Sequence, residues 1–165
     1  MKRNSRGFSL IELLIVVAII AIIAAIAVPS MLTSRMAANE AGAISGCRTI
    51  GSAEVAYAAV NNQAYADLDT LVDGNYLDER FASDSEGFNG YAYTDEALGF
   101  GTGDAAVPDG FHFKATPASA DSSGRYIYGI AADQVVRFIG VAGAADPPAG
   151  LEAGDPIGKK AAAGG

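Results

Sequence analysis

The most regular pattern in the chain is an apolar run near its N-terminus. Leu13 to Val28 are sixteen residues without a polar side chain, and the longer segment from Phe8 to Val28 is interrupted only by Ser9 and Glu12. A helix of these 21 residues is about 30 Å long, which matches the hydrocarbon core of a bilayer. Three basic residues precede the run, so the positive-inside rule predicts a cytoplasmic N-terminus.

From Met31 to about Asn61 the pattern changes to an amphipathic helix. The apolar stripe at helical spacing consists of Ile44, Cys47, Gly51, Val55 and Ala58, with Glu40 and Glu54 at its border. Together with the apolar run, this predicts one helix of about 55 residues, bent near Pro29. The first half is apolar all round and the second half is amphipathic, which indicates two environments.

Three glycines lie inside the predicted amphipathic half. The spacing of Gly42 and Gly46 would allow the backbone of a neighbouring element to approach closely. The alternative is that each glycine is merely tolerated and destabilises the helix by about 1 kcal/mol relative to alanine. Cys47 is on the apolar stripe and is expected to be a small buried hydrophobe. An intermolecular disulfide is the alternative for this cysteine.

The remaining sequence predicts a small antiparallel sheet. A polar connection from Ala64 to Asn89 contains enough apolar residues for one short helical turn. The predicted strands, three or four in number, are Tyr91–Thr94, Phe111–Thr116, Arg125–Ile130 and Val135–Ile139, and Ala131–Gln134 forms a hairpin turn between the last two. The fold class is therefore α+β, with one face of the sheet packed on the amphipathic half of the helix.

From Gly140 onward the composition turns to Gly, Ala and Pro, which predicts a flexible tail over 140–165.

The charge balance argues against nucleic-acid binding by a basic patch. The whole chain has a net charge of −8, with 11 basic and 19 acidic residues, and three of the basic residues lie in the first seven positions. Neutralising phosphates requires clustered Lys and Arg, and the remaining chain lacks them. The single cysteine excludes an intrachain disulfide.

Glu12 at the start of the apolar run is the residue that distinguishes three interpretations of this segment. A carboxylate at mid-bilayer costs roughly 2.5–3.5 kcal/mol, so an acid there suggests a function. An ordinary secretory signal is supported by the basic start and by a small-x-small cleavage site at Ala25–Ala27. A plain single-span anchor explains the length. Neither accounts for Glu12 or for the Gly7-Phe8 pair before it.

The segment from Gly7 to Ile20, Gly-Phe-Ser-Leu-Ile-Glu-Leu-Leu-Ile-Val-Val-Ala-Ile-Ile, resembles the class III signal of type IV pilins and of type II secretion pseudopilins. The resemblance implies that a prepilin peptidase cuts between Gly7 and Phe8 and that Phe8 becomes N-methylated. Glu12 then falls at the position of the acid that this family uses in assembly. Pro29 also fits the pattern, whereas Ala21 replaces a common glycine, which puts local unwinding there in doubt.

The resemblance also implies an organisation and a function. Residues 1–7 are a cleaved leader, 8–30 a membrane-spanning or fibre-core helix half, and 31–139 a globular headgroup. The expected protein is a structural subunit of a type IV pilus-like filament used for adhesion, motility or uptake. The alternatives are a type II secretion pseudopilin and, in another class, an anchored or secreted binding domain.

Expected partners are identical or related pilins, the prepilin peptidase and the inner-membrane assembly machinery. The precursor is expected in the bacterial inner membrane, and the filament outside the cell or, for a pseudopilin, in the periplasm.

The proposed role of Glu12 also follows from electrostatics. Cleavage would place a positive amine on Phe8, four residues from the Glu12 carboxylate, and an unpaired charge in low dielectric is costly. The two groups are therefore expected to pair, within a chain or between neighbouring subunits, where the pair would set the axial register.

The sequence offers few residues for catalysis or metal binding. His112 is the only histidine and is expected to be a solvated strand residue, so neither a zinc site nor a Cys-His pair is indicated. Weak candidates for calcium are Asp84 and Glu86, or Asp67 and Asp69, without the spacing of a known ligand loop. We therefore expect no cofactor, no metal and no enzymatic activity.

Overall fold

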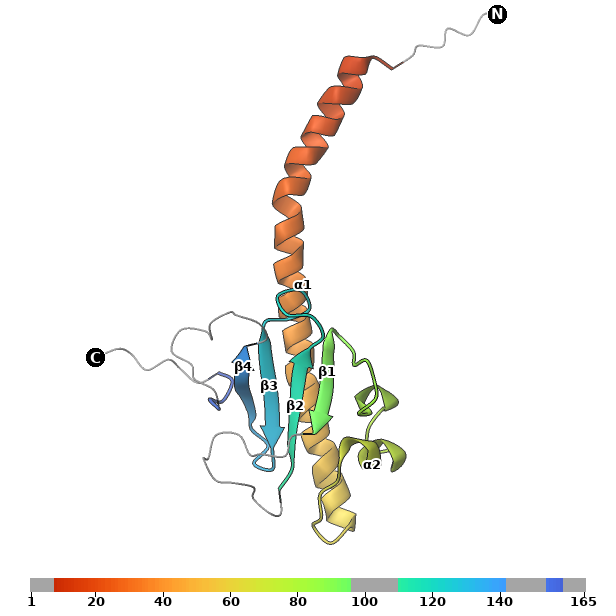
Figure 1. The fold of residues 1–165 in the computed structure, drawn as a ribbon, viewed down its shortest axis with the longest axis vertical. Helices are drawn as coiled ribbons and strands as arrows, with labels where there is room; N and C mark the ends of the chain where they lie inside the picture. The colour runs from red at the N-terminus through yellow and green to blue at the C-terminus, as the bar shows by residue number, and fades with distance from the viewer. Residues whose placement is uncertain (1–7, 96–109, 142–153, 159–165) are drawn as a thin grey trace, which may run out of the picture. The chain divides into compact units, whose positions relative to one another are not determined.

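The computed structural model describes residues 8–95, 110–141 and 154–158. The chain divides into two compact units, Met1–Arg35 and Met36–Gly165. Helix α1, Leu10–Val60, is continuous across this division (Figure 1). The second unit also contains helix α2 (Leu68–Asp73), a 3-10 helix (Glu79–Phe81), and strands β1 (Tyr91–Asp95), β2 (His112–Pro117), β3 (Tyr126–Ala131) and β4 (Val136–Val141).

The four strands form one antiparallel sheet in the order β1-β2-β3-β4, so every neighbour in the sheet is also a neighbour in sequence. The turn between β3 and β4 is closed by Gln134, whose N–H donates to the Ala131 carbonyl at 2.9 Å and whose φ is 62°. The predicted α+β fold, a long helix with a small antiparallel sheet, is confirmed, and each observed strand lies within two residues of its predicted ends.

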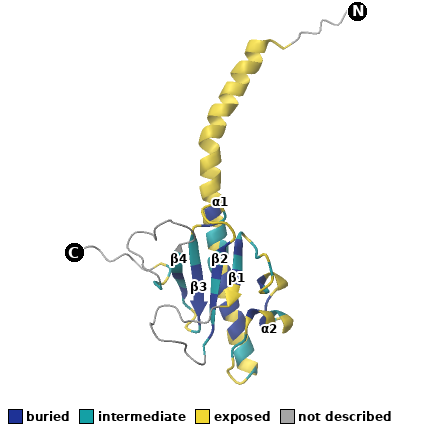
Figure 2. Ribbon diagram, in the orientation of Figure 1, coloured by how far each residue is buried: buried dark blue, intermediate teal, exposed yellow. Residues whose placement is uncertain are grey.

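The core of the second unit lies between the later part of α1 and one face of the sheet (Figure 2). Ala43, Cys47 and Ile50 of α1 are fully buried, and Phe113 and Ile130 face them from β2 and β3 with 1% of their surface exposed. Helix α2 closes one side of this core with two more fully buried leucines. Cys47 is thus a buried, free cysteine, as predicted.

The buried face of α1 is rotated from the predicted stripe. Val55, which the pattern placed on the apolar face, is 52% exposed, whereas Glu54 at the predicted border is fully buried. Gly46, which is not on the predicted stripe, lies where the Tyr93 ring approaches the helix, and Ala43 and Ile50 are buried on the same side. A pattern based on side-chain hydrophobicity does not locate the part of a contact face that is made by glycine. Gly46 thus makes room for the Tyr93 side chain.

Helix α1 ends at Val60, next to the predicted end at about Asn61. Asn62 and Gln63 have φ values of 55° and 64°, in the left-handed region where a helix ends. The Gln63 N–H then donates to the Ala58 carbonyl at 2.9 Å.

One short segment of the predicted C-terminal tail pairs with the edge of the sheet. Pro156 lies opposite Arg137 in an antiparallel bridge. Phe138 N–H donates to the Asp155 carbonyl at 2.9 Å, and Ile157 N–H donates to the Val136 carbonyl at 3.1 Å. In this register the Pro156 nitrogen points away from β4, which is the side on which a proline is tolerated in an edge strand. The first two residues of the predicted tail, Gly140 and Val141, belong to β4, because they pair with Ile127 and Tyr126 of β3. The other residues of the predicted tail lie outside the described residues.

Candidate processing and assembly site

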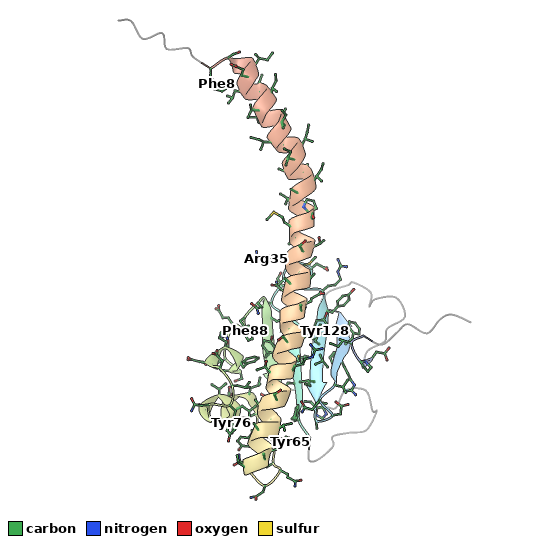
Figure 3. The ribbon with its side chains drawn as sticks, turned by 180° about the vertical axis from the view of Figure 1, so that it is seen from behind. Phe8, Arg35, Tyr65, Tyr76, Phe88 and Tyr128 are labelled. Atoms are coloured by element: carbon green, nitrogen blue, oxygen red, sulfur yellow. The ribbon has the colours of Figure 1, made fainter. Side chains whose placement is uncertain are left out.

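The predicted processing site lies at the start of α1. Gly7 and the leader lie outside the described residues. Phe8 is 81% exposed, and the helix begins two residues later at Leu10 (Figure 3). The cleavage between Gly7 and Phe8 and the methylation of Phe8 remain predictions.

Glu12 closes the first turn of α1 by a local hydrogen bond. The Ser9 N–H donates to Glu12 Oε2 at 2.9 Å, and the Leu13 N–H donates to the Ser9 carbonyl at 3.2 Å. Ser9 therefore occupies the N-cap, and Glu12 supplies the acceptor that reaches back to it, which is one half of a capping box. The helix dipole favours a carboxylate at this end.

The N-cap role of Ser9 was not predicted from the sequence. The signal was available, because Ser followed three residues later by Glu before an apolar run is the sequence signature of a helix start. The Phe8 nitrogen is an amide as long as Gly7 is attached to it, so it carries no charge for Glu12 to pair with. The ion pair between the Phe8 amine and Glu12 remains a prediction about the cleaved chain.

The first unit has no core of its own. Every described residue from Phe8 to Arg35 is exposed, and the most apolar 18-residue window of α1 has a mean hydropathy of 3.2 with no buried share (Figure 2). By length and composition, α1 is able to cross a membrane. An apolar surface of this extent needs lipid or other apolar helices around it, because soluble monomers rarely expose such patches.

Pro29 lies inside α1, and the helix continues past it. Proline has no N–H and removes one helical hydrogen bond. Nearby hydroxyl groups find acceptors on the backbone of the same helix: Thr33 Oγ1 donates to the Ser30 carbonyl at 3.0 Å, and Ser34 Oγ donates to the same carbonyl at 2.9 Å. These polar side chains therefore need no partner outside the helix. The bend predicted at Pro29 remains a prediction.

Two of the acidic residues considered as calcium ligands have structural roles, and the other two lie on an exposed loop. Asp67 is the N-cap of α2 and accepts from the Thr70 N–H at 2.7 Å, and Asp69 accepts from the N–H and hydroxyl of Ser83. Hydrogen bonds from these donors lower the pKa of both carboxyls. Asp84 and Glu86 are exposed on the loop that follows. Within the described residues, no group of three or more His, Cys, Asp or Glu side chains is placed to hold a metal ion.

A buried carboxyl group joins α1 to the following loop. Glu54 is 0% exposed, and both of its oxygens accept from the Ala66 N–H, at 3.2 and 3.3 Å. Burial raises the pKa of Glu54 to about 7, against the opposing effect of the Ala66 N–H. Asp95, at the end of β1, accepts from the Leu68 N–H at 3.2 Å, and its pKa is also raised by burial. The two carboxyl groups and Asp67 therefore meet where α1, α2 and β1 come together.

His112 and Cys47 do not form a reactive pair. His112 is half-buried in β2 between two buried phenylalanines, on the sheet face opposite to them. Cys47 lies in the core, and burial raises the pKa of its thiol to about 12, so it stays protonated and unreactive.

Comparison with known proteins identifies the N-terminal segment. Residues 2–28 match the prokaryotic N-terminal methylation motif. This motif is the class III prepilin signal, typical of type IV pilins and pseudopilins. No curated protein matches the chain. The motif overlaps the start of a long helix, α1, which packs on a four-stranded antiparallel sheet, and the two together define a type IV pilin-like protein with a prepilin signal. Such a protein is structural and not an enzyme.

Proposed function

We propose that this protein is the subunit of a type IV pilus-like filament, made as an inner-membrane precursor and polymerised through the N-terminal part of α1. The observation that carries the proposal is the exposure of every residue from 8 to 35, a segment that overlaps the prepilin signal at residues 2–28. Before assembly, lipid covers this apolar surface. In the filament, the same segments of neighbouring subunits cover one another, since their apolar side chains lose nothing in exchanging lipid for other helices.

Cleavage between Gly7 and Phe8 supplies the charge that assembly uses. It converts the Phe8 amide into an amine, four residues before a carboxylate that is already held at the helix start by Ser9. The amine of an incoming subunit and Glu12 of its neighbour then neutralise each other in a medium of low dielectric. A subunit docked out of register leaves both charges unpaired, so the pair favours a single axial position.

The direct test is the mass of the native N-terminus. Protein from cells that express the prepilin peptidase is expected to begin at Phe8 and to carry one methyl group on its amine. The same chain made without the peptidase is expected to retain the leader. A mature protein that starts near Val28, or that keeps Met1 in the presence of the peptidase, would contradict the proposal.

The role of Glu12 is tested by two substitutions. Glu12→Ala removes both the cap and the charge, whereas Glu12→Gln keeps an acceptor for the Ser9 N–H and removes only the charge. If the charge is needed for assembly, both variants are processed normally and both fail to form filaments. Filaments from Glu12→Gln but not from Glu12→Ala would assign Glu12 to helix capping alone.

The type II secretion pseudopilin is the second candidate, and one observation favours it. The only cysteine is buried in the core, so the headgroup has no disulfide to protect it outside the cell. The two functions differ in where the polymer is found. Filaments recovered by shearing intact cells support a pilus. A processed subunit that stays with the envelope, and whose loss blocks secretion of other proteins, supports a pseudopilus.

A further inference from the structure

The side of α1 that faces away from the sheet carries a stripe of short side chains. We call this the outer stripe, and all its members are exposed: Ala41, Ser45, Arg48, Ser52, Val55 and Ala59. Their spacing of three and four residues puts them on one helix face. Arg48 is the only long side chain among them, so it projects alone from an otherwise low surface.

Two hydroxyl groups on and beside the outer stripe donate to the backbone of their own helix. Ser52 Oγ donates to the Arg48 carbonyl at 3.0 Å, and Thr49 Oγ1 donates to the Ser45 carbonyl at 3.1 Å. Another protein surface can therefore cover this face without leaving these hydroxyl donors unpaired. The free-energy cost of burying them is small for the same reason.

Arg48 differs from the other arginines of the second unit. Arg80 pairs with Asp78, Arg125 with Asp121 and Arg137 with Asp133. Arg48 forms no ion pair with any residue that the structure describes. Among the described residues, this leaves Arg48 as a cation without a carboxylate partner, in the middle of the exposed outer stripe.

A complementary surface lies on the loop around the 3-10 helix, to one side of α1, where Figure 3 labels Tyr76 and Phe88. Here a hollow of about 370 Å³ is lined by Asp78, Glu79, Arg80, Asp84 and Ser85. We call it the acidic hollow. Arg80 offsets only one of the three carboxylates, because its guanidinium pairs with Asp78 at 2.7 Å and lies over the Phe88 ring, 4.8 Å from the ring centroid. Glu79 and Asp84 are exposed and form no ion pair within the described residues.

A polymer of identical subunits that grows along an axis needs two different surfaces that fit each other, because a contact between identical patches closes into a dimer. The second unit presents one surface of each kind, an unpaired cation on the outer stripe and an excess of carboxylates in the acidic hollow. We propose that Arg48 of one subunit docks into the acidic hollow of a second copy of this chain. This contact between headgroups rests on the proposed filament and adds to the Phe8–Glu12 pair.

Charge reversal tests this contact in the full-length protein, in cells that assemble the wild-type filament. Arg48→Glu and Asp84→Arg each replace attraction by repulsion, and each is expected to lower the yield of sheared filament at least about tenfold. The double variant restores the attraction in reverse and is expected to recover most of the yield. Arg125→Glu is the matched control, because Arg125 is an exposed arginine outside both surfaces, and its yield should stay within about twofold of the wild type.

A second measurement detects the contact directly. Arg48→Cys combined with Asp84→Cys is expected to give a ladder of disulfide-linked subunits under oxidation, whereas Arg48→Cys combined with Asp121→Cys gives none. The native Cys47 does not interfere, because it is buried. The absence of a ladder in the first variant, or an equal ladder in both, overturns the proposal.

The outcomes separate this contact from the proposed function. Wild-type filaments that persist in Arg48→Glu, with a normally processed N-terminus, overturn the docking alone. Single variants that lose filaments without rescue in the double variant also overturn it. A processed wild-type chain that never polymerises overturns both.

Discussion

At the scale of single residues, two neighbouring tyrosines of β1 are buried in different ways. Tyr91 donates its hydroxyl to the Tyr126 carbonyl at 2.9 Å. The hydroxyl of Tyr93, a residue that is 3% exposed, has no hydrogen-bond partner among the described residues. It lies against Gly46 of α1, where the absence of a side chain makes room for it. A buried hydroxyl without a partner has lost its hydration and gained nothing in return.

Removing these two hydroxyls is therefore expected to have opposite effects. Tyr93→Phe should leave the free energy of unfolding unchanged or raise it by about 1 kcal/mol, because a desolvated, unpaired group disappears. Tyr91→Phe should lower it by about 1 kcal/mol, because the Tyr126 carbonyl loses its donor. Chemical denaturation of the detergent-solubilised chain measures both. Equal destabilisation by the two substitutions would indicate that Tyr93 has a partner in solution.

Glu54 gives the headgroup a pH dependence with a definite sign. Its pKa rises from 4.5 in the unfolded chain to about 7 in the folded one, so the folded state holds the proton more tightly. Stability that depends on this proton is complete below about pH 4.5 and is lost as the pH rises through about 7. The full difference is about 3 kcal/mol by linkage.

Glu54→Gln is expected to remove this dependence. The amide oxygen can still accept from the Ala66 N–H, and it does not ionise. Unfolding curves of the two proteins should coincide near pH 4 and diverge towards pH 8, with the variant more stable. A difference that does not change with pH would contradict the raised pKa of Glu54.

At the scale of elements, the contact between α1 and β1 depends on a glycine. A Cβ atom at Gly46 would overlap the Tyr93 hydroxyl and ring, whereas at Gly42 it would meet only the side chain of Asn89, at 3.0 Å or more. The two glycines are one helical turn apart on the same helix, and only one of them is fixed by packing.

Replacing each glycine by alanine separates packing from helix propensity. Gly46→Ala should destabilise the protein by about 1–3 kcal/mol, because a buried ring has to move. Gly42→Ala should be neutral or stabilising by up to about 1 kcal/mol, since alanine favours the helix and the exposed Asn89 side chain can move aside. Thermal unfolding followed by circular dichroism compares them. A stabilising Gly46→Ala would show that Tyr93 repacks without cost.

The sequence predicted the positions of the helices and strands better than it predicted which of their faces are buried. The alternation of Phe111, Phe113 and Ala115 located β2, and Asn61-Asn62-Gln63 located the end of α1, because both signals are local. The burial of Glu54 depends on the Ala66 N–H, twelve residues away, and hydrophobicity gives no sign of it. At the candidate site, Phe8 and Glu12 stood out from the sequence, whereas the pairing of Pro156 with β4 depends on a contact between distant parts of the chain.

At the scale of the whole molecule, the chain consists of two units with opposite solvation. The first exposes an apolar helix throughout its described length, and the second has its own core and an acidic surface. Since the buried core residues that the structure describes all lie at Met36 or later, we expect the headgroup to fold without the first unit.

A truncated protein that begins at Met31 is therefore expected to fold by itself. It should remain in solution without detergent, elute as a monomer and unfold cooperatively, with the strand content of the full-length protein. The full-length chain under the same conditions should require detergent. An aggregated or unfolded fragment would show that the headgroup needs the first unit for its stability.

The pairing of Pro156 with β4 limits the kinds of fibre that this chain can build. A sheet that continues from subunit to subunit has to add a strand at each edge, and a single closed edge is enough to stop it. At the β4 edge the outermost backbone position is occupied by a residue without an N–H. Fibre diffraction should therefore lack the strong meridional reflection at about 4.7 Å that marks cross-β order, and the polymer should dissolve in conditions that leave amyloid intact.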